Sequence, residues 1–154
     1  MSGCHSCELV TRRDTGAAPA WDSILRTDAW DLGHAYGTSL PGWMVLVLRR
    51  HSTSLAEMTD REAAELGPLI QGVSRALHEV TSCAKTYVVQ FAEAADHPHV
   101  HVHVIPRASD LPEELRGPSI FKLLGVPTRE WVPEDRMNDI AKSLKVELQG
   151  LTEG

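Results

Sequence analysis

The alternation of apolar and polar positions predicts several strands and one long helix. Trp43 to Leu48 is an apolar run of strand length, and Tyr87 to Ala92 is a second run rich in β-branched and aromatic residues. One or two shorter strands are expected between residues 23 and 35. A further strand is expected from His99 to Ile105, where histidine alternates with valine until Pro106 ends the run.

Helical periodicity is clearest from Asp60 to Thr81, where apolar residues recur at three- and four-residue steps. Thr59 and Glu62 have the spacing of a capping box, in which each side chain hydrogen-bonds the backbone of the other residue. A terminal helix is expected over Pro133 to Gln149, and residues 1–20 are predicted to be irregular. The predicted order is strands, a long helix, further strands and a terminal helix. This order indicates an α+β fold with a mostly antiparallel sheet.

Chain length, net charge and the length of the apolar runs exclude some classes of protein. The chain has 154 residues, which is enough for one domain with a real core. Its formal net charge of −6 argues against binding a nucleic acid polymer, which requires a basic face. No membrane span or signal peptide is expected, because the longest apolar run, Met44 to Leu48, is far shorter than the ~20 residues that a membrane helix needs. A cytoplasmic protein is therefore expected.

The stretch HPHVHVHVIPR, from His97 to Arg107, holds four of the chain's eight histidines. Successive side chains of a strand point to opposite faces, so His99, His101 and His103 are expected to share one face at intervals of about 7 Å. Such a face can be a solvated surface, a metal site or a site for nucleophilic catalysis by an imidazole. Solvated strand faces usually carry Thr, Lys or Glu, so the last two interpretations are favoured.

These residues resemble the signature of the histidine triad superfamily, H-φ-H-φ-H-φ-φ, in which φ is apolar. His99 to Ile105 matches this signature, and PGWMVLVLRRH (Pro41 to His51) resembles the family strand PGHxLVIPKRH. The likeness covers about residues 4–107. It implies a HIT-like α+β fold for a single domain over residues 1–154, with a triad core at about 4–107 and a C-terminal extension at 108–154.

The resemblance also implies an activity, because the family hydrolyses or transfers nucleoside monophosphates that are joined to a leaving group through phosphate. His101 would be the nucleophile that attacks the α-phosphorus and forms a nucleotidyl-histidine intermediate. His103 would contact the phosphate or the leaving group, and His99 would complete the active-site network in members without zinc. Expected substrates are adenosine 5′-phosphate conjugates, either dinucleoside polyphosphates or AMP–amine phosphoramidates.

Zinc-bearing members of the family share a C-x-x-C motif near the N-terminus. By this resemblance Cys4, Cys7, His51 and His99 would form a closed tetrahedral Cys₂His₂ site with a structural role. Two alternatives are that the cysteines bind nothing, or that they form a redox pair. The redox interpretation is disfavoured because no helix is predicted to start after Cys4. Magnesium could accompany a polyphosphate substrate by bridging its oxygens.

The sequence departs from the family pattern in two places. Trp43 stands where the family strand usually has histidine, and the loop before the triad lacks the family's N-x-G-x-x-A-G-Q. That loop instead carries Glu93 and Asp96, which would place negative charge near a phosphate. Either a substrate with a cationic group, as in phosphoramidates, would offset this charge, or the loop points away and His97 and Arg107 supply the compensating charge.

Other substrate contacts are expected from Gln90, His97 and Arg107, and Trp30 is a candidate for the base cleft. The resemblance further implies a homodimer, since family members commonly pair through the long helix and a shared sheet. Two alternatives remain open. The altered loop could leave a zinc-stabilised nucleotide-binding or regulatory protein without catalysis, or zinc held by the three triad histidines could make a metal-dependent enzyme.

Overall fold

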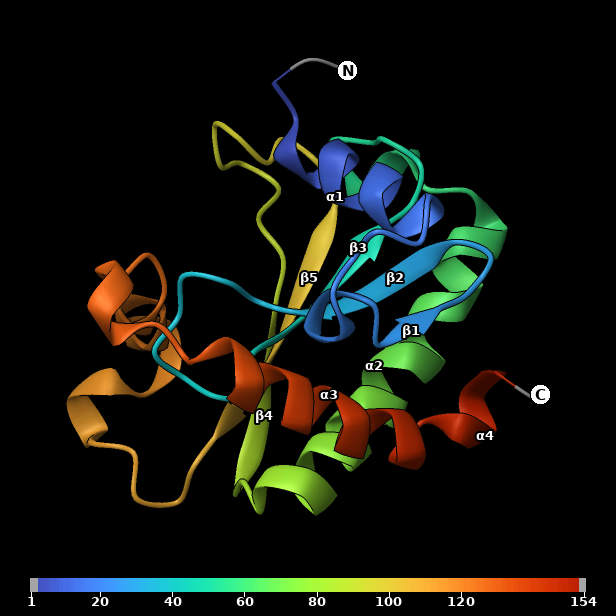
Figure 1. Ribbon diagram of the computed structural model, residues 1–154. Helices are drawn as coiled ribbons and strands as arrows, with labels where there is room; N and C mark the ends of the chain where they lie inside the picture. Colours follow the sequence, from blue (N-terminus) through green and yellow to red (C-terminus); the bar gives the residue numbers. More distant parts are fainter. Residues whose placement is uncertain (1–2, 153–154) are drawn as a thin grey trace.

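A five-stranded antiparallel sheet forms the centre of the computed structural model, which describes residues 3–152 (Figure 1). The strand order is β1-β2-β3-β5-β4, and every neighbouring pair is antiparallel. The expected α+β fold with an antiparallel sheet is therefore confirmed. The strands are β1 (Leu25–Arg26), β2 (Trp30–His34), β3 (Met44–Leu48), β4 (Lys85–Val89) and β5 (His101–Arg107).

The helices lie against and beside this sheet (Figure 1). The α-helices are α1 (His5–Asp14), α2 (Asp60–Thr81), α3 (Glu134–Glu147) and α4 (Gln149–Thr152). Within residues 3–152, five short 3₁₀ helices lie in the segments between these elements: η1 (Ala20–Asp22), η2 (Leu55–Glu57), η3 (Glu113–Leu115), η4 (Gly117–Leu123) and η5 (Thr128–Glu130). None of the helices in residues 3–152 combines the length and apolar content needed to cross a bilayer.

The two faces of β5 differ as the alternation predicts. Val102 and Val104, with Val100 just before the strand, are buried in the main core together with apolar residues of α2 and α3. The opposite face presents His101 and His103 to a cavity. Strand pairing begins only at His101 and continues through Pro106 to Arg107, so the strand lies two residues later than expected.

Helix α2 begins with the predicted capping box. Thr59 Oγ1 accepts a hydrogen bond from the Glu62 backbone N–H at 3.1 Å, and Glu62 Oε1 accepts one from the Thr59 N–H at 2.8 Å. Glu62 Oε1 also lies 2.8 Å from Nη2 of Arg50. The hydrogen bond from Arg50 lowers the pKa of Glu62 to about 2, so the carboxylate is ionised at neutral pH.

Glu62→Gln is expected to lower the free energy of unfolding by about 1 kcal/mol at pH 7, because the amide keeps an acceptor but loses the charge. The folded-state pKa of Glu62 lies below its ordinary 4.5, so the stabilisation is present above about pH 4.5 and lost as pH falls towards 2. Urea unfolding of the wild type and of Glu62→Gln at pH values between 7 and 2 should show that the difference in their free energies of unfolding becomes smaller as pH falls. A difference that stays constant with pH would contradict the ion-pair explanation.

The N-terminal segment corrects one expectation. Residues 1–20 were predicted to be irregular, whereas α1 spans His5–Asp14. Cys4 is its N-cap, and the Cys4 thiol accepts a hydrogen bond from the Cys7 N–H at 3.4 Å. Thiols are not among the side chains that usually signal a helix start, so the sequence pattern gave no indication of α1.

Candidate active site and metal centre

The histidine face of the sheet lines a cavity of about 560 Å³. One wall comes from α1, through residues such as Ser6 and Leu9, and another from the loop between β4 and β5. The segment that follows η3, which includes Phe121 and Trp131, forms a third wall of the cavity. The apolar and aromatic side chains in this lining include Leu9, Val45, Val47, Phe91, Phe121, Leu124, Val126 and Trp131. A cavity with a few polar groups in an apolar lining has the character of a small-molecule site.

His101 is held by the backbone of its own strand. Its Nδ1 lies 2.7 Å from the carbonyl oxygen of His99. A carbonyl can only accept, so Nδ1 carries the proton and donates. In the neutral ring Nε2 then has a free lone pair, and the partly exposed ring lines the cavity. This arrangement suits a nucleophile.

His103 lies beside His101, with ring centroids 5.1 Å apart. Its Nδ1 is 2.9 Å from the indole nitrogen of Trp43. Trp43 immediately precedes β3 and is fully buried. Burial, followed by the neighbouring His101 and His97, lowers the pKa of His103 to about 3. The ring is therefore neutral at physiological pH.

His97 also lines the cavity and is fixed at both ring nitrogens. Nδ1 lies 2.8 Å from the Ser6 hydroxyl, and Nε2 lies 2.8 Å from the Tyr36 hydroxyl. Burial lowers the pKa of His97 and raises that of Tyr36 to about 12, so Tyr36 keeps its proton. These bonds join α1, the end of β2 and the loop before β5 around the cavity.

Charged groups at the cavity are mostly acidic. Glu93 and Asp96 belong to the lining, as does Asp22. The guanidinium in the lining is Arg13, and its Nη2 lies 2.7 Å from Asp22 Oδ1. Gly33 makes room for this pair, because a Cβ there would lie 2.7 Å from Asp22 Oδ1. The Arg13 charge is therefore already paired with an acid.

The four expected metal ligands converge beside this cavity. One donor atom from each of Cys4, Cys7, His51 and His99 lies within 4.8 Å of all the others. Nδ1 of His99 is 3.5 Å from both sulfurs and 3.2 Å from His51 Nδ1. Cys7 Sγ is 3.2 Å from His51 Nδ1. Donors at such separations surround a single point, as a tetrahedral ion requires.

This cluster can hold zinc, since two thiolates and two imidazoles are a typical donor set for a closed structural site. His99 Nε2 lies 2.5 Å from the Leu48 carbonyl, which fixes the ring with Nδ1 towards the cluster. Without a cation, burial and the Cys4 thiol raise the pKa of Cys7 to about 11. Zinc would displace these thiol protons.

The cluster also changes two expectations about the histidines. His99 was expected on the same strand face as His101 and His103, but it precedes β5 and its ring belongs to the cysteine cluster. Within residues 3–152 no other group of His, Cys, Asp or Glu side chains is arranged to hold a metal ion. The interpretation of zinc bound by the three triad histidines therefore has no support in the geometry. No helix was predicted to start after Cys4, and this was the argument against a redox pair, but α1 does start there. Metal binding is still favoured over a redox pair, because both cysteines lie beside His51 and His99.

The comparison with protein-family models gives one match, to the HIT domain, over residues 37–110. Residues 37–110 therefore form a HIT domain. The match includes both β3 and the histidine run of β5. A search of curated proteins finds no match to this chain.

Solved structures share the HIT fold over nearly the whole chain. A zinc-bound histidine triad family protein from Mycobacterium smegmatis has a TM-score of 0.66 at 19% identity, covering 96% of this chain and 94% of its own. A hypothetical histidine triad nucleotide-binding protein from Sulfolobus tokodaii strain7 has a TM-score of 0.69 at 14% identity, covering 94% and 93%. A uridylyltransferase has a TM-score of 0.65 at 17% identity, covering 96% of this chain and 45% of its own.

Three residues expected to contact substrate lie away from the cavity of this HIT domain. Trp30 is 1% exposed in the core beneath α2, and its indole donates to the Glu62 carbonyl. Arg107 ends β5, where its Nη1 contacts the Ala108 carbonyl. Gln90 follows β4 and is not part of the cavity lining. Their roles as substrate contacts stay predictions without geometric support.

The sequence analysis missed several residues that do line the cavity. Ser6 belongs to the unexpected helix α1, and Phe121 and Trp131 belong to the segment after the HIT-domain match. Tyr36 immediately precedes that match. No family motif covers these positions, and only the fold brings them to the triad.

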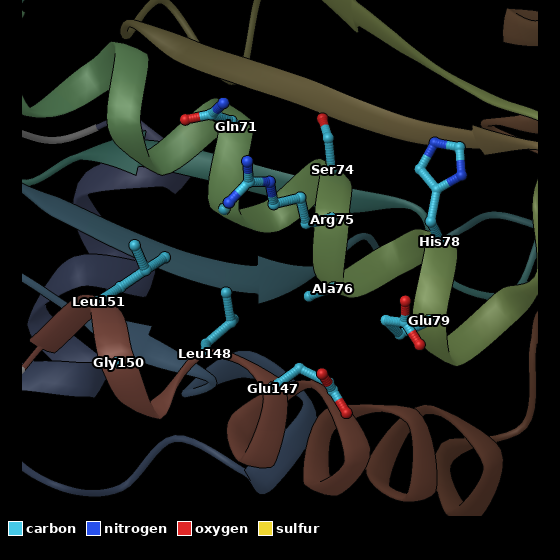
Figure 2. Close-up of a pocket in the computed structure, with 11 residues that line it drawn as sticks. Gln71, Ser74, Arg75, Ala76, His78, Glu79, Glu147, Leu148, Gly150 and Leu151 are labelled. Carbon is cyan, nitrogen blue, oxygen red and sulfur yellow. The ribbon is translucent and has the colours of Figure 1, made fainter.

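A second cavity, of about 750 Å³, lies between the outer side of α2 and the C-terminal helices (Figure 2). Its α2 wall carries Arg75, His78 and Glu79. Helix α4 approaches closely because Gly72 has no side chain, and a Cβ there would lie 2.3 Å from Leu151 Cδ1. This cavity contains neither the triad nor the metal cluster, so its side chains provide matched controls for experiments on the active site.

Proposed function

We propose that the protein is a nucleotide hydrolase or nucleotidyl transferase that acts at the α-phosphate of adenosine 5′-phosphate conjugates. The observation that carries the proposal is the state of His101. Its Nδ1 is bonded to the His99 carbonyl, which leaves the Nε2 lone pair directed to a cavity of nucleotide size.

The reaction proceeds in two displacements. His101 Nε2 forms a bond to the α-phosphorus, and the bond from phosphorus to the leaving group breaks, with the leaving group keeping the electron pair and taking a proton from solvent. Water, which loses a proton to solvent, or an acceptor phosphate then attacks the same phosphorus, and the histidine nitrogen leaves with the electron pair of the P–N bond. His103 and backbone N–H groups provide hydrogen bonds to the phosphoryl oxygens, where negative charge is concentrated.

The charge of the cavity favours an amine as the leaving group. Glu93 and Asp96 line the cavity, while the Arg13 guanidinium is occupied by Asp22. A polyphosphate chain brings several negative charges into this acidic surrounding, whereas an AMP–amine phosphoramidate brings one and can carry a cationic group. Phosphoramidates are therefore the proposed substrates, and a dinucleoside polyphosphate would need a bridging magnesium ion.

The test is AMP release by the zinc-loaded protein from an AMP–lysine phosphoramidate and from diadenosine tetraphosphate, with and without magnesium. We expect release from the phosphoramidate without magnesium and slower release from the tetraphosphate. If both compounds bind but neither is cleaved, the alternative applies, namely a zinc-stabilised nucleotide-binding or regulatory protein. If neither binds, the proposal fails.

The acidic loop should control the choice between these substrates. Glu93→Gln together with Asp96→Asn is expected to raise kcat/KM for diadenosine tetraphosphate by about tenfold and to lower it for a cationic phosphoramidate by a similar factor. The effect should shrink in high salt. Glu79→Gln, which removes a carboxylate from the other cavity, is the matched control. Equal changes for both substrates would show that the loop does not select by charge.

We also propose that the whole chain, residues 1–154, works as one domain in the cytoplasm. Phe121 and Trp131, from the segment expected to be an extension, line the same cavity as the triad. A homodimer is proposed through α2 and β4, since β4 is an edge strand and Val88 on it is 45% exposed. Light scattering at two concentrations would test the dimer.

A further inference from the structure

We propose that Trp43 is a positioning residue of the active site, and that its indole N–H holds His103 in the tautomer protonated on Nε2. His103 then serves as a fixed hydrogen-bond donor to the substrate phosphate. The identity of the acceptor rests on the proposed function, whereas the tautomer follows from contacts within the chain and can be tested without substrate.

The hydrogen bond between the two side chains has only one possible direction. Trp43 Nε1 lies 2.9 Å from His103 Nδ1. An indole nitrogen always donates and never accepts, so Nδ1 of His103 has to accept and is unprotonated. A neutral imidazole with an unprotonated Nδ1 carries its proton on Nε2. The Trp43 side chain is fully buried, so water does not compete for its N–H.

Packing keeps the His103 ring in this orientation. Trp43 and Phe121 make T-shaped contacts with it, with centroids 5.8 and 5.2 Å away and interplanar angles of 86° in both cases. Phe121 and Trp43 also contact each other at 5.2 Å. Turning the ring over would place a carbon against the indole N–H and leave that buried donor without a partner, which is costly.

The other nitrogen of His103 is available to a ligand. His103 lines the cavity, and its Nε2 has no hydrogen-bond partner within residues 3–152. The titratable groups that face the ring are His101 and His97, while Trp43 and Phe121 are uncharged. Burial together with these histidines disfavours a second proton on His103. A neutral Nε2–H donor therefore faces the place where the phosphate is expected.

The two neighbouring histidines are thus held in opposite tautomers. The His99 carbonyl keeps the proton of His101 on Nδ1, so its Nε2 can attack. The Trp43 indole keeps the proton of His103 on Nε2, so this nitrogen can only donate. The division of roles between attack and hydrogen-bond donation is set by a backbone acceptor on one ring and an indole donor on the other.

Nitrogen-15 NMR of the zinc-loaded wild-type protein tests the tautomer directly. We expect His103 Nδ1 to resonate as an unprotonated nitrogen and Nε2 as a protonated one at pH 7, with a scalar coupling across the hydrogen bond to Trp43 Nε1. His103→Asn identifies the resonances by their loss. A protonated Nδ1, or no coupling to the indole, would overturn the proposal whatever the protein's substrate proves to be.

A pair of variants separates the donor from simple packing. Trp43→Phe keeps a ring in the core but removes the N–H, and it is expected to give His103 a mixture of tautomers and to lower kcat about tenfold with little change in KM. Phe121→Leu also removes a ring that touches His103, yet His103 should keep its single tautomer. If Trp43→Phe retains that tautomer and full kcat, the proposal fails. If this variant does not fold, the wild-type spectrum still decides.

Discussion

His101→Ala is expected to lower kcat/KM on an AMP–amine phosphoramidate by about 10³- to 10⁵-fold, since removing a nucleophile removes the covalent route altogether. The partly exposed ring makes its hydrogen bond to the backbone of its own strand, so its loss should disturb the fold little. AMP release under single-turnover conditions measures the chemical step. Rapid acid quenching of the wild type should also trap nucleotide on the protein, and the variant should trap none.

His78→Ala is the matched control, because His78 lies on α2 in the other cavity (Figure 2). It should retain wild-type kcat/KM and the same trapped nucleotide. A loss of less than tenfold in His101→Ala would contradict nucleophilic catalysis by this residue, provided that zinc content and circular dichroism match the wild type. Trapping of nucleotide on another residue would assign the nucleophile elsewhere.

Loss of the metal is expected to cost the most stability. Cys7→Ser should lower the free energy of unfolding by at least about 3 kcal/mol in the presence of zinc, because metal binding to a structural site contributes directly to folding. The metal would join α1 to the end of β3 and to the residues before β5, through Cys7, His51 and His99. Thermal unfolding with added zinc and with a chelator gives the measurement. Cys83→Ser, at a buried free thiol outside the cluster, is the control.

The same cluster predicts a direction for pH. The raised pKa of Cys7 means that protons compete with zinc for the sulfur, so the zinc-dependent part of the stability should fall as pH decreases. Chelation should lower the melting temperature at neutral pH and have less effect in acid, where zinc has already dissociated. A chelator that abolishes activity at once, with the melting temperature unchanged, would instead indicate a catalytic metal.

Local sequence signals predicted those parts of the fold that local interactions determine. The capping box of Thr59 and Glu62 placed the start of α2 correctly, and the alternation of histidine with valine assigned the two faces of β5. Helix α1 was missed because its N-cap is a cysteine and its ends are held by tertiary contacts, such as the bond from the His5 N–H to the Asp96 carbonyl. Such contacts leave no periodic pattern in sequence.

The candidate site divides in the same way. The four metal ligands could be predicted because a motif fixes their spacing, and their donor atoms do converge. Of the three triad histidines, His101 and His103 line the cavity, whereas His99 belongs to the metal cluster. Trp30 and Arg107 were assigned from the family resemblance, without a motif that fixes their position in the site. In the fold Trp30 lies in the core and Arg107 lies at the C-terminal end of β5. Tyr36 and Ser6 meet at His97 from distant parts of the chain, which only the folded topology reveals.

Helix α1 places Ser6, which holds His97, next to Cys7, a ligand of the metal cluster. One short helix therefore provides both a ligand for the proposed metal and a wall of the cavity that His101 lines. An evolving lineage could not discard the metal and keep the cavity unchanged, because the same ten residues supply both. Exchange of this helix between related HIT-domain proteins would then exchange the lining of the cavity and the cysteine ligands together, as one inherited unit.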